Sequence, residues 1–328
     1  MQSGFRDPVM AVVAAAVLFG AATPVLKLLL GLLTPLVLAA LLSLGAGCGV
    51  LFWLCLGGTG FPLREISRND RTLLIGTVLI GGTLAPVVQF SALTVTSAAT
   101  ASLLLNFEIV ATILIAFLFF REPIDQKTGI ALAAIIAGSV VLSGSGDGIS
   151  TISAGSFGIL AACVLWGIDN NLMGRIGGIR PEAIVVIRGF CGGCITGIFA
   201  LITGQPFPNI VICAIAFATG LFAFGGGLVF LISALRQMGA ARAGAIYAAA
   251  PFVGCIVSLA LFSEVPGTGF WIAVPLFLAG AGFIVWDHWF PQKNASFDEA
   301  PPVGAEECPG NGRRQAERLR FRKSPDRE

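Results

Sequence analysis

The sequence contains few charged residues and almost no histidine or tyrosine. Charged side chains make up 12% of the 328 residues, hydrophobic residues make up 56%, and the mean hydropathy is +0.89. So little polar surface cannot coat a water-soluble globule. The single tyrosine, the single histidine (His288) and the net charge of +2 leave little for stacking on nucleic-acid bases or for an imidazole metal site. We expect no nucleic-acid partner, no metal and no cofactor.

The eight cysteines do not indicate a disulfide framework. Seven of them fall in apolar runs, where cysteine serves as a small packing residue. Cys191 and Cys194 form a C-x-x-C pair, but glycines surround both of them. Glycines at this density are typical of closely packed membrane helices, so we interpret the pair as packing rather than metal binding.

Apolar runs long enough to cross a bilayer recur along the chain. Lipid offers no hydrogen-bond partners to the backbone, so each run must form a helix or belong to a closed barrel, and runs of about 20 residues fit helices. We therefore predict an all-α integral membrane protein with ten transmembrane helices. The predicted helices cover residues 8–31, 34–56, 72–94, 98–120, 127–144, 156–174, 181–203, 209–234, 242–263 and 267–289. The charged tail 290–328 is predicted to be disordered.

Lysine and arginine are distributed unevenly among the predicted loops. If the N-terminus is cytoplasmic, every one of the 20 basic residues except Lys27 and Arg188 lies in a cytoplasmic loop or in the tail. Short cytoplasmic loops retain basic residues, so this distribution predicts that both termini are cytoplasmic. We expect a multi-pass protein of the cell (inner) membrane, with the lipid bilayer as its surroundings and either a monomer or a homodimer as its state.

Two segments of the sequence repeat each other. Residues 97–122 align without gaps on residues 239–264, at an offset of 142. A looser match, at an offset of 147, places Phe19-Gly20 on Trp166-Gly167. The repeating unit therefore contains five helices, and an odd number of spans forces the second copy to enter from the opposite face. The predicted inverted repeats cover residues 8–144 and 155–289.

A set of short motifs recurs in register in the two repeats. The motifs are Phe19-Gly20 to Lys27, Trp166-Gly167, Pro251, and the pairs Glu122/Gly138 and Glu264/Gly280. Together they resemble the EamA family of the drug/metabolite transporter superfamily across about residues 8–289. The resemblance implies a ten-helix solute carrier, often an exporter of amino acids, metabolites or drugs, that works by alternating access. The chain departs from the family pattern at Phe19, where tryptophan is usual, and at Ile109, where proline is expected.

Charged residues inside the predicted helices are candidates for function, because each costs a few kcal/mol in a bilayer. Glu108 is the strongest candidate, since it lies roughly 15 Å from the outer start of its helix, near the bilayer centre. A carboxyl group there could alternate between protonated and ionised forms, which would make protons the coupling ion. The alternative is a structural carboxylate that is paired, for example with Lys27, or hydrogen-bonded within the helix bundle. Lys27 itself extends to the outer headgroups, or it reaches into the cavity to hold an anionic group or Glu108.

The polar run Asp169-Asn170-Asn171 interrupts an apolar helix just after Trp166. Successive helical residues turn by about 100°, so at least one of the three must point into a cavity or an interhelical contact. Arg188 lies at a similar depth on the next predicted helix. A structural ion pair between Asp169 and Arg188 explains this arginine better than a role in binding substrate.

Neutral polar residues complete the predicted substrate cavity. The full set is Glu108, Asp169, Asn170, Asn171, Lys27, Asn106, Gln89, Tyr247 and Trp166. Hydrogen bonding between helices is the alternative interpretation for Gln89, Asn106 and Tyr247. Glu122 and Glu264 lie at equivalent helix ends, and we predict that they anchor the ends of the repeats rather than bind substrate.

These features favour a secondary transporter of a small metabolite, amino acid-like solute or drug that works by alternating access, and the family resemblance implies export. A membrane enzyme is disfavoured, because the sequence contains no H-E-x-x-H, G-x-S-x-G or P-loop motif. A non-transporting scaffold or receptor is the alternative, with the basic tail recruiting lipid or a partner. Charges inside an inverted repeat favour transport over a scaffold.

Overall fold

The architecture is described here from a computed structural model, which covers residues 7–56, 67–121, 124, 126–143, 154–238, 243, 246–262 and 266–289. The side chains of residues 127, 235, 236, 238 and 284–289 are outside this description. Glu122, Glu264 and the tail 290–328, for which we made predictions, also lie outside the described residues.

The described residues form helices and contain no β-strand, which confirms the predicted all-α fold. In chain order the elements are α1 (Pro8–Leu30), α2 (Pro35–Leu56), α3 (Arg68–Leu79), the π-helix η1 (Ile80–Leu84), α4 (Ala85–Thr94), α5 (Ala98–Leu104), α6 (Phe107–Phe120), α7 (Gln126–Ser143), α8 (Ala154–Arg175), α9 (Pro181–Ile202), α10 (Ile210–Thr219), the π-helix η2 (Gly220–Gly226), α11 (Gly227–Met238), α13 (Ala250–Phe262) and α14 (Thr268–Trp289). When α3–η1–α4, α5–α6 and α10–η2–α11 are each counted as one span, the elements follow the ten predicted spans.

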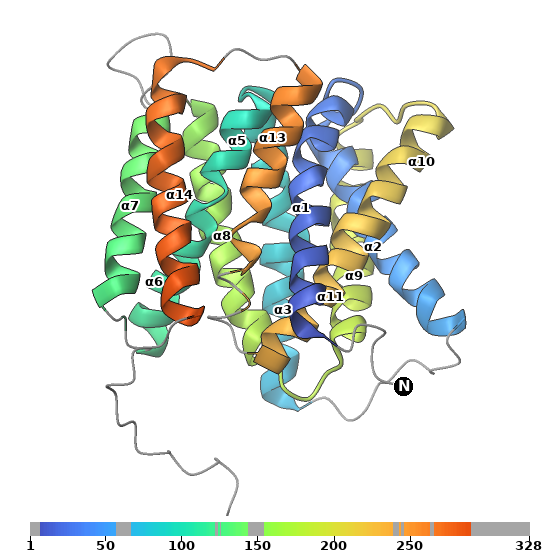
Figure 1. Cartoon of the computed structure of the whole chain (residues 1–328). Helices are drawn as coiled ribbons and strands as arrows, with labels where there is room; N and C mark the ends of the chain where they lie inside the picture. Colours follow the sequence, from blue (N-terminus) through green and yellow to red (C-terminus); the bar gives the residue numbers. More distant parts are fainter. Residues whose placement is uncertain are drawn as a thin grey trace, which may run out of the picture. The chain divides into compact units, whose positions relative to one another are not determined.

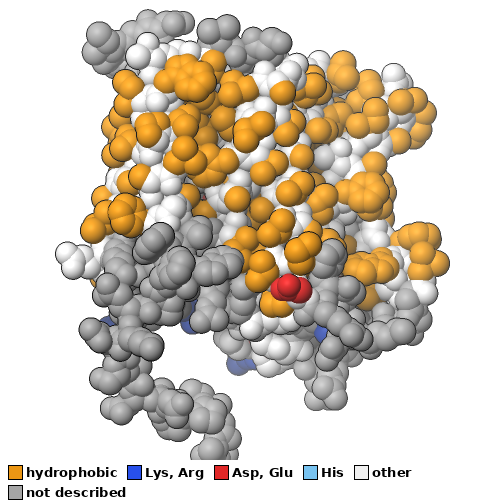
Figure 2. Space-filling model, in the orientation of Figure 1, with side chains coloured by type: hydrophobic (Ala, Val, Ile, Leu, Met, Phe, Trp, Pro, Cys, Tyr) orange, Lys and Arg blue, Asp and Glu red, His pale blue; other side chains and the backbone are white. Residues whose placement is uncertain are grey.

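The surface of the helix bundle is apolar. Seven of the described helices are long and apolar enough to cross a membrane, and three shorter apolar helices accompany them. Large side chains such as Phe119, Ile202 and Ile210 are 76%, 77% and 80% exposed. Figure 2 shows hydrophobic side chains spread over most of the visible face of the helices. Lipid is the solvent that such a surface fits, because in water it would be a large exposed apolar patch.

The bundle has two halves, α1–α7 and α8–α14. Their first helices, α1 and α8, are antiparallel in Figure 1. Equivalent helices of the two halves pack on each other, namely α2 on α9, α7 on α14 and α5 on α13. Moreover, α1 packs against α11 and α13 of the second half, just as α8 packs against α4 and α6 of the first. Equivalent helices therefore contact each other in pairs across the boundary between the halves.

One glycine in each half allows the first helix to approach the other half closely. A Cβ atom added at Gly20 of α1 would lie 2.8 Å from the Val253 Cβ in α13. A Cβ added at Gly167 of α8 would lie 2.8 Å from the Ala111 Cβ in α6. Ala111 and Val253 are themselves equivalent at the offset of 142. The glycine shared by Phe19-Gly20 and Trp166-Gly167 thus serves the same close helix contact in both halves.

The predicted helix 98–120 is not continuous, because a tight turn at Leu105–Asn106 separates α5 from α6. Here short hydrogen-bonded turns appear, with the Asn106 N–H donating to Leu103 O and the Ile109 N–H donating to Asn106 O. The second half has the same feature before α13, where the Ala249 N–H donates to Ile246 O. Tightened turns of this kind within a helix are often found at hinges or at strained positions.

Each half also contains a π-helix between two α-helices. The repeat offset of 142 places Ile80–Leu84 on residues 222–226, which lie within η2. Pro86 follows η1 and has no N–H to donate, so the helix there cannot keep regular i to i−4 bonding. The π-helices contain glycines that pack against the opposite half. Gly81 of η1, for example, packs against Asp169, which lines the site described next.

Candidate functional site

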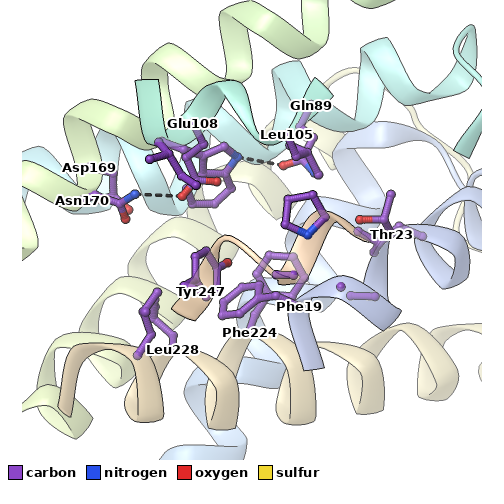
Figure 3. Close-up of a pocket in the computed structure, with 18 of the residues that line it drawn as sticks. Phe19, Thr23, Gln89, Leu105, Glu108, Asp169, Asn170, Phe224, Leu228 and Tyr247 are labelled. Atoms are coloured by element: carbon purple, nitrogen blue, oxygen red, sulfur yellow. Dashed lines mark hydrogen bonds between the residues drawn. The ribbon is translucent and has the colours of Figure 1, made fainter. Parts of the chain in front are cut away.

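A cavity opens between the two halves at the level of the interrupted helices. The first half contributes α1, α4 and the α5–α6 region, and the second half contributes α8, η2, α11 and the start of α13 (Figure 3). Its volume is about 70 Å³. The lining residues are Phe19, Gly20, Ala22, Thr23, Leu26, Gln89, Leu105, Glu108, Ile109, Trp166, Asp169, Asn170, Met173, Phe224, Leu228, Leu231, Tyr247, Ala250 and Pro251.

Glu108 lies in the first turn of α6, immediately after the tightened turn. The Asn170 amide nitrogen, from α8, donates a hydrogen bond to Glu108 Oε1 at 2.8 Å (Figure 3). The same nitrogen lies 3.4 Å from Thr112 Oγ1, and the Thr112 hydroxyl donates to the Glu108 backbone oxygen at 2.8 Å. A carboxylate at the start of a helix also offsets the partial positive charge of the helix dipole. One neutral donor, the Asn170 amide, and the start of a helix therefore hold this acidic side chain.

Gln89 and Trp166 form a second polar contact in the cavity wall. The Trp166 indole N–H donates to Gln89 Oε1 at 2.8 Å, which ties α8 to α4 (Figure 3). Because the Gln89 oxygen accepts this bond, the amide nitrogen of the same side chain remains as the donor that a bound solute can use.

Asp169 and Arg188 form a buried ion pair beside the cavity. Arg188 Nη2 lies 2.9 Å from Asp169 Oδ2, and the two side chains are 7% and 0% exposed. The guanidinium also lies 5.3 Å from the centre of the Trp166 ring. η1 leaves room for this pair, because a Cβ added at Gly81 would overlap the Asp169 carboxylate and one at Gly82 would lie 3.0 Å from Arg188 Cγ.

Three aromatic rings close another side of the cavity. The Phe19 ring centre lies 5.5 Å from that of Phe224 and 5.8 Å from that of Tyr247, with interplanar angles of 75° and 84°. Figure 3 shows this aromatic corner, formed by Phe19, Phe224 and Tyr247, across the cavity from Glu108. Sequence analysis did not identify Phe224, because a phenylalanine in an apolar run is not distinguished from its neighbours. The signal that could have found this region is the adjacent run of glycines, Gly225–Gly227, which indicates an irregular helix.

The structure brings six of the nine residues of the predicted cavity to its wall and places the other three elsewhere. Lys27 donates from Nζ to the backbone oxygens of Leu93, Thr94 and Thr96, at 2.7, 3.1 and 2.8 Å. These carbonyls lie at the C-terminal end of α4, where a cation is favourable. Lys27 is not among the residues that line the cavity.

Asn106 and Asn171 are the other two residues that lie outside the cavity wall. Asn106 is fully buried, and its amide nitrogen donates to Leu103 O at 3.0 Å within the tightened turn. The Asn171 amide nitrogen donates to Thr112 O at 2.9 Å and to Gly167 O at 2.8 Å. Both side chains satisfy backbone groups where helices are interrupted or closely packed, which sequence alone does not distinguish from lining a cavity.

The fold and the site define a multi-pass α-helical membrane protein with a largely apolar cavity between its two halves, into which a few polar side chains point. The model of the EamA-like transporter family matches residues 8–144 and 153–286. The chain belongs to this family. It is 27% identical over 301 residues to an uncharacterized transporter from Methanothermobacter thermautotrophicus, a match that covers 84% of this chain and 85% of that protein.

One solved structure, titled only as the crystal structure of a protein, has a similar fold. It superposes with a TM-score of 0.63 at 17% sequence identity, over 84% of this chain and 95% of the other. At that level of identity the similarity concerns the fold alone.

Proposed function

We propose that the protein is a secondary transporter that exports a small solute by alternating access, and that the cavity around Glu108 is its binding site. The observation that carries this proposal is the position of the cavity. Both halves line it, at the depth where α5 turns into α6 and where α13 begins. Interrupted helices around a site in the middle of the membrane are a common arrangement in secondary transporters.

The size of the cavity favours a small solute. A volume of about 70 Å³ exceeds the roughly 10–15 Å³ that a cavity needs to hold one water, whereas pockets for drug-sized ligands measure roughly 300–1,000 Å³. In this conformation the site therefore suits a metabolite of a few heavy atoms better than a large drug.

The interruptions of the helices supply candidate hinges. η1 and η2 lie at equivalent positions of the two halves, and the tightened turns at Asn106 and Ala249 lie at the cavity. We propose that each half rocks about these four points, so that the cavity opens to one side of the cell membrane at a time, with both termini cytoplasmic.

We further propose that protons drive export through Glu108. The side chain is held by the neutral Asn170, so it can bind and release a proton without breaking an ion pair. The other titratable side chains around it are Asp169, Arg188, Tyr247 and Cys163. Because Asp169 already pairs with Arg188, Glu108 is the acidic group best placed to exchange protons.

The test is transport of a panel of metabolites by the full chain in proteoliposomes, with and without a pH gradient. We expect flux of at least one solute, stimulated by the gradient, and loss of that stimulation in Glu108→Gln. The matched control is Glu182→Gln, which removes a carboxylate that pairs with Arg180 away from the cavity. If no solute moves, the transporter proposal is wrong. If Glu108→Gln keeps the full response to the gradient, proton coupling through Glu108 is wrong.

A further inference from the structure

The charges that line the cavity are unbalanced. Asp169 is matched by Arg188 at 2.9 Å, so this pair contributes no net charge. Glu108 receives a hydrogen bond only on Oε1, from a neutral amide, and the described residues give its other oxygen no hydrogen bond. None of the lining residues is a lysine or arginine, and Lys27 binds the carbonyls at the end of α4. The cavity therefore carries one negative charge when Glu108 is ionised.

A buried carboxylate is stabilised by a cation that fits beside it, because low-dielectric surroundings penalise an uncompensated charge. An anionic solute would meet the opposite situation, since its charge would face Glu108 without a basic side chain to hold it. The available neutral donors, such as the Gln89 amide, suit hydroxyl or carbonyl groups rather than a full negative charge.

The aromatic corner favours a particular kind of cation. The rings of Phe19 and Phe224 are nearly perpendicular, as are those of Phe19 and Tyr247, and they lie across the cavity from Glu108 (Figure 3). Ring faces attract ammonium groups, and the attraction is strongest where water is excluded. A metal ion would need several oxygen ligands, whereas an alkylammonium group needs one carboxylate and apolar or aromatic walls.

We propose that the transported solute is a small organic monocation, in which an ammonium group lies between Glu108 and the aromatic corner. This inference rests on the proposed transport function and names the substrate class of the same site. The solute's alkyl part would contact apolar lining residues such as Leu105 and Leu228. The start of α13 also faces the cavity and has no acidic residue in its first turn. The partial positive charge of this helix N-terminus could accept a carboxylate. A zwitterion that places its carboxylate there is therefore the alternative that the test must separate.

The experiment compares four probes of nearly the same shape on the purified full chain in nanodiscs, with binding measured by titration calorimetry. The probes are choline, its neutral carbon isostere 3,3-dimethylbutanol, the anion 3,3-dimethylbutanoate and the zwitterion glycine betaine. We expect choline to bind at least about 10-fold more tightly than each of the other three. Equal affinity for choline and its isostere, tighter binding of betaine, or no binding of any probe would each overturn the proposal.

Variants assign the effect to the two parts of the site. Glu108→Gln should weaken choline about 10-fold or more and leave the neutral isostere unchanged. Phe224→Leu and Tyr247→Leu should each weaken choline by about 2- to 30-fold, again sparing the isostere. Glu182→Gln serves as the control that should change neither affinity, and size-exclusion profiles establish that each variant is folded. Choline affinity that is unchanged in Glu108→Gln would contradict the proposed role of the carboxylate.

Transport measurements separate failure of this inference from failure of the transport proposal. If the metabolite panel in proteoliposomes yields flux of a neutral or anionic solute but none of any cation, the substrate class is wrong and the transporter remains. If no solute of any charge is transported, the transport proposal fails together with this inference.

Discussion

The buried ion pair between Asp169 and Arg188 permits a quantitative prediction. At 2.9 Å and an effective dielectric constant of about 20, two unit charges attract by about 6 kcal/mol. Removing both charges from water costs several kcal/mol per ion, so the net contribution of the pair is small. Removal of one partner, however, leaves the other charge buried without compensation. We therefore expect Arg188→Met to lower the free energy of unfolding by about 3–5 kcal/mol.

The double variant separates this explanation from a simple loss of packing. Asp169→Ala combined with Arg188→Met removes both charges, and its stability should exceed that of Arg188→Met alone. The assay is unfolding by sodium dodecyl sulfate in mixed micelles, followed by tryptophan fluorescence, for the wild type, both single variants and the double variant. A cost below about 1 kcal/mol for Arg188→Met, or strictly additive single effects, would refute the reasoning.

Further predictions concern helix contacts and Lys27, all measured by the same unfolding assay. Gly167→Ala should destabilise the protein by about 1–3 kcal/mol, because its Cβ would lie 2.8 Å from the Ala111 Cβ. The matched control Gly174→Ala, in the same helix with nothing within 4 Å, should be neutral or stabilising by up to about 1 kcal/mol. Equal effects at the two glycines would contradict the close contact of α8 with α6. Gly81→Ala should also destabilise, since the added methyl group overlaps the Asp169 carboxylate, and an unchanged midpoint would argue against that packing. Lys27→Met should lower stability by about 1–3 kcal/mol through loss of hydrogen bonds to the end of α4, without weakening choline. A large loss of choline affinity in this variant would instead place Lys27 in the binding site.

Sequence patterns predicted the helices well, because bilayer thickness forces long apolar runs that are easy to recognise. The N-terminal boundary of α3 shows where this signal stops. The helix begins at Arg68 rather than residue 72, since the Ser67 hydroxyl caps it by accepting from the Asp70 N–H at 3.0 Å. A polar first turn outside the apolar run is invisible to a hydropathy criterion but is specified by its capping residue.

The interruptions of the helices were harder to predict. Leu105–Asn106 contains neither glycine nor proline, so the usual turn signals are absent, although the Asn106 side chain stabilises the turn locally by donating to Leu103 O. Helix α8 packs against α5 and α6 on the two sides of this turn. Likewise, an intramembrane lysine such as Lys27 signals a polar partner, but the sequence does not reveal that the partner is the end of α4.

The cavity residues also divide into those that the sequence identifies and those that only the structure identifies. Glu108, Asp169 and Asn170 stand out because polar side chains are expensive in lipid, and all three line the cavity. Phe19 and Phe224 lie in apolar helices where aromatic residues are ordinary, so only the three-dimensional arrangement reveals the aromatic corner.

The central claim, that the cavity gives alternating access to the two sides of the membrane, can be tested by cysteine accessibility. Thr23 lines the cavity and is 4% exposed, and cysteine closely matches its size. Thr23→Cys in a cysteine-free background would be exposed to a membrane-impermeant thiol reagent, separately from each side of oriented vesicles. We predict labelling from both sides, with substrate changing the two rates. Labelling from one side only, unaffected by any transported solute, would contradict alternating access through this cavity.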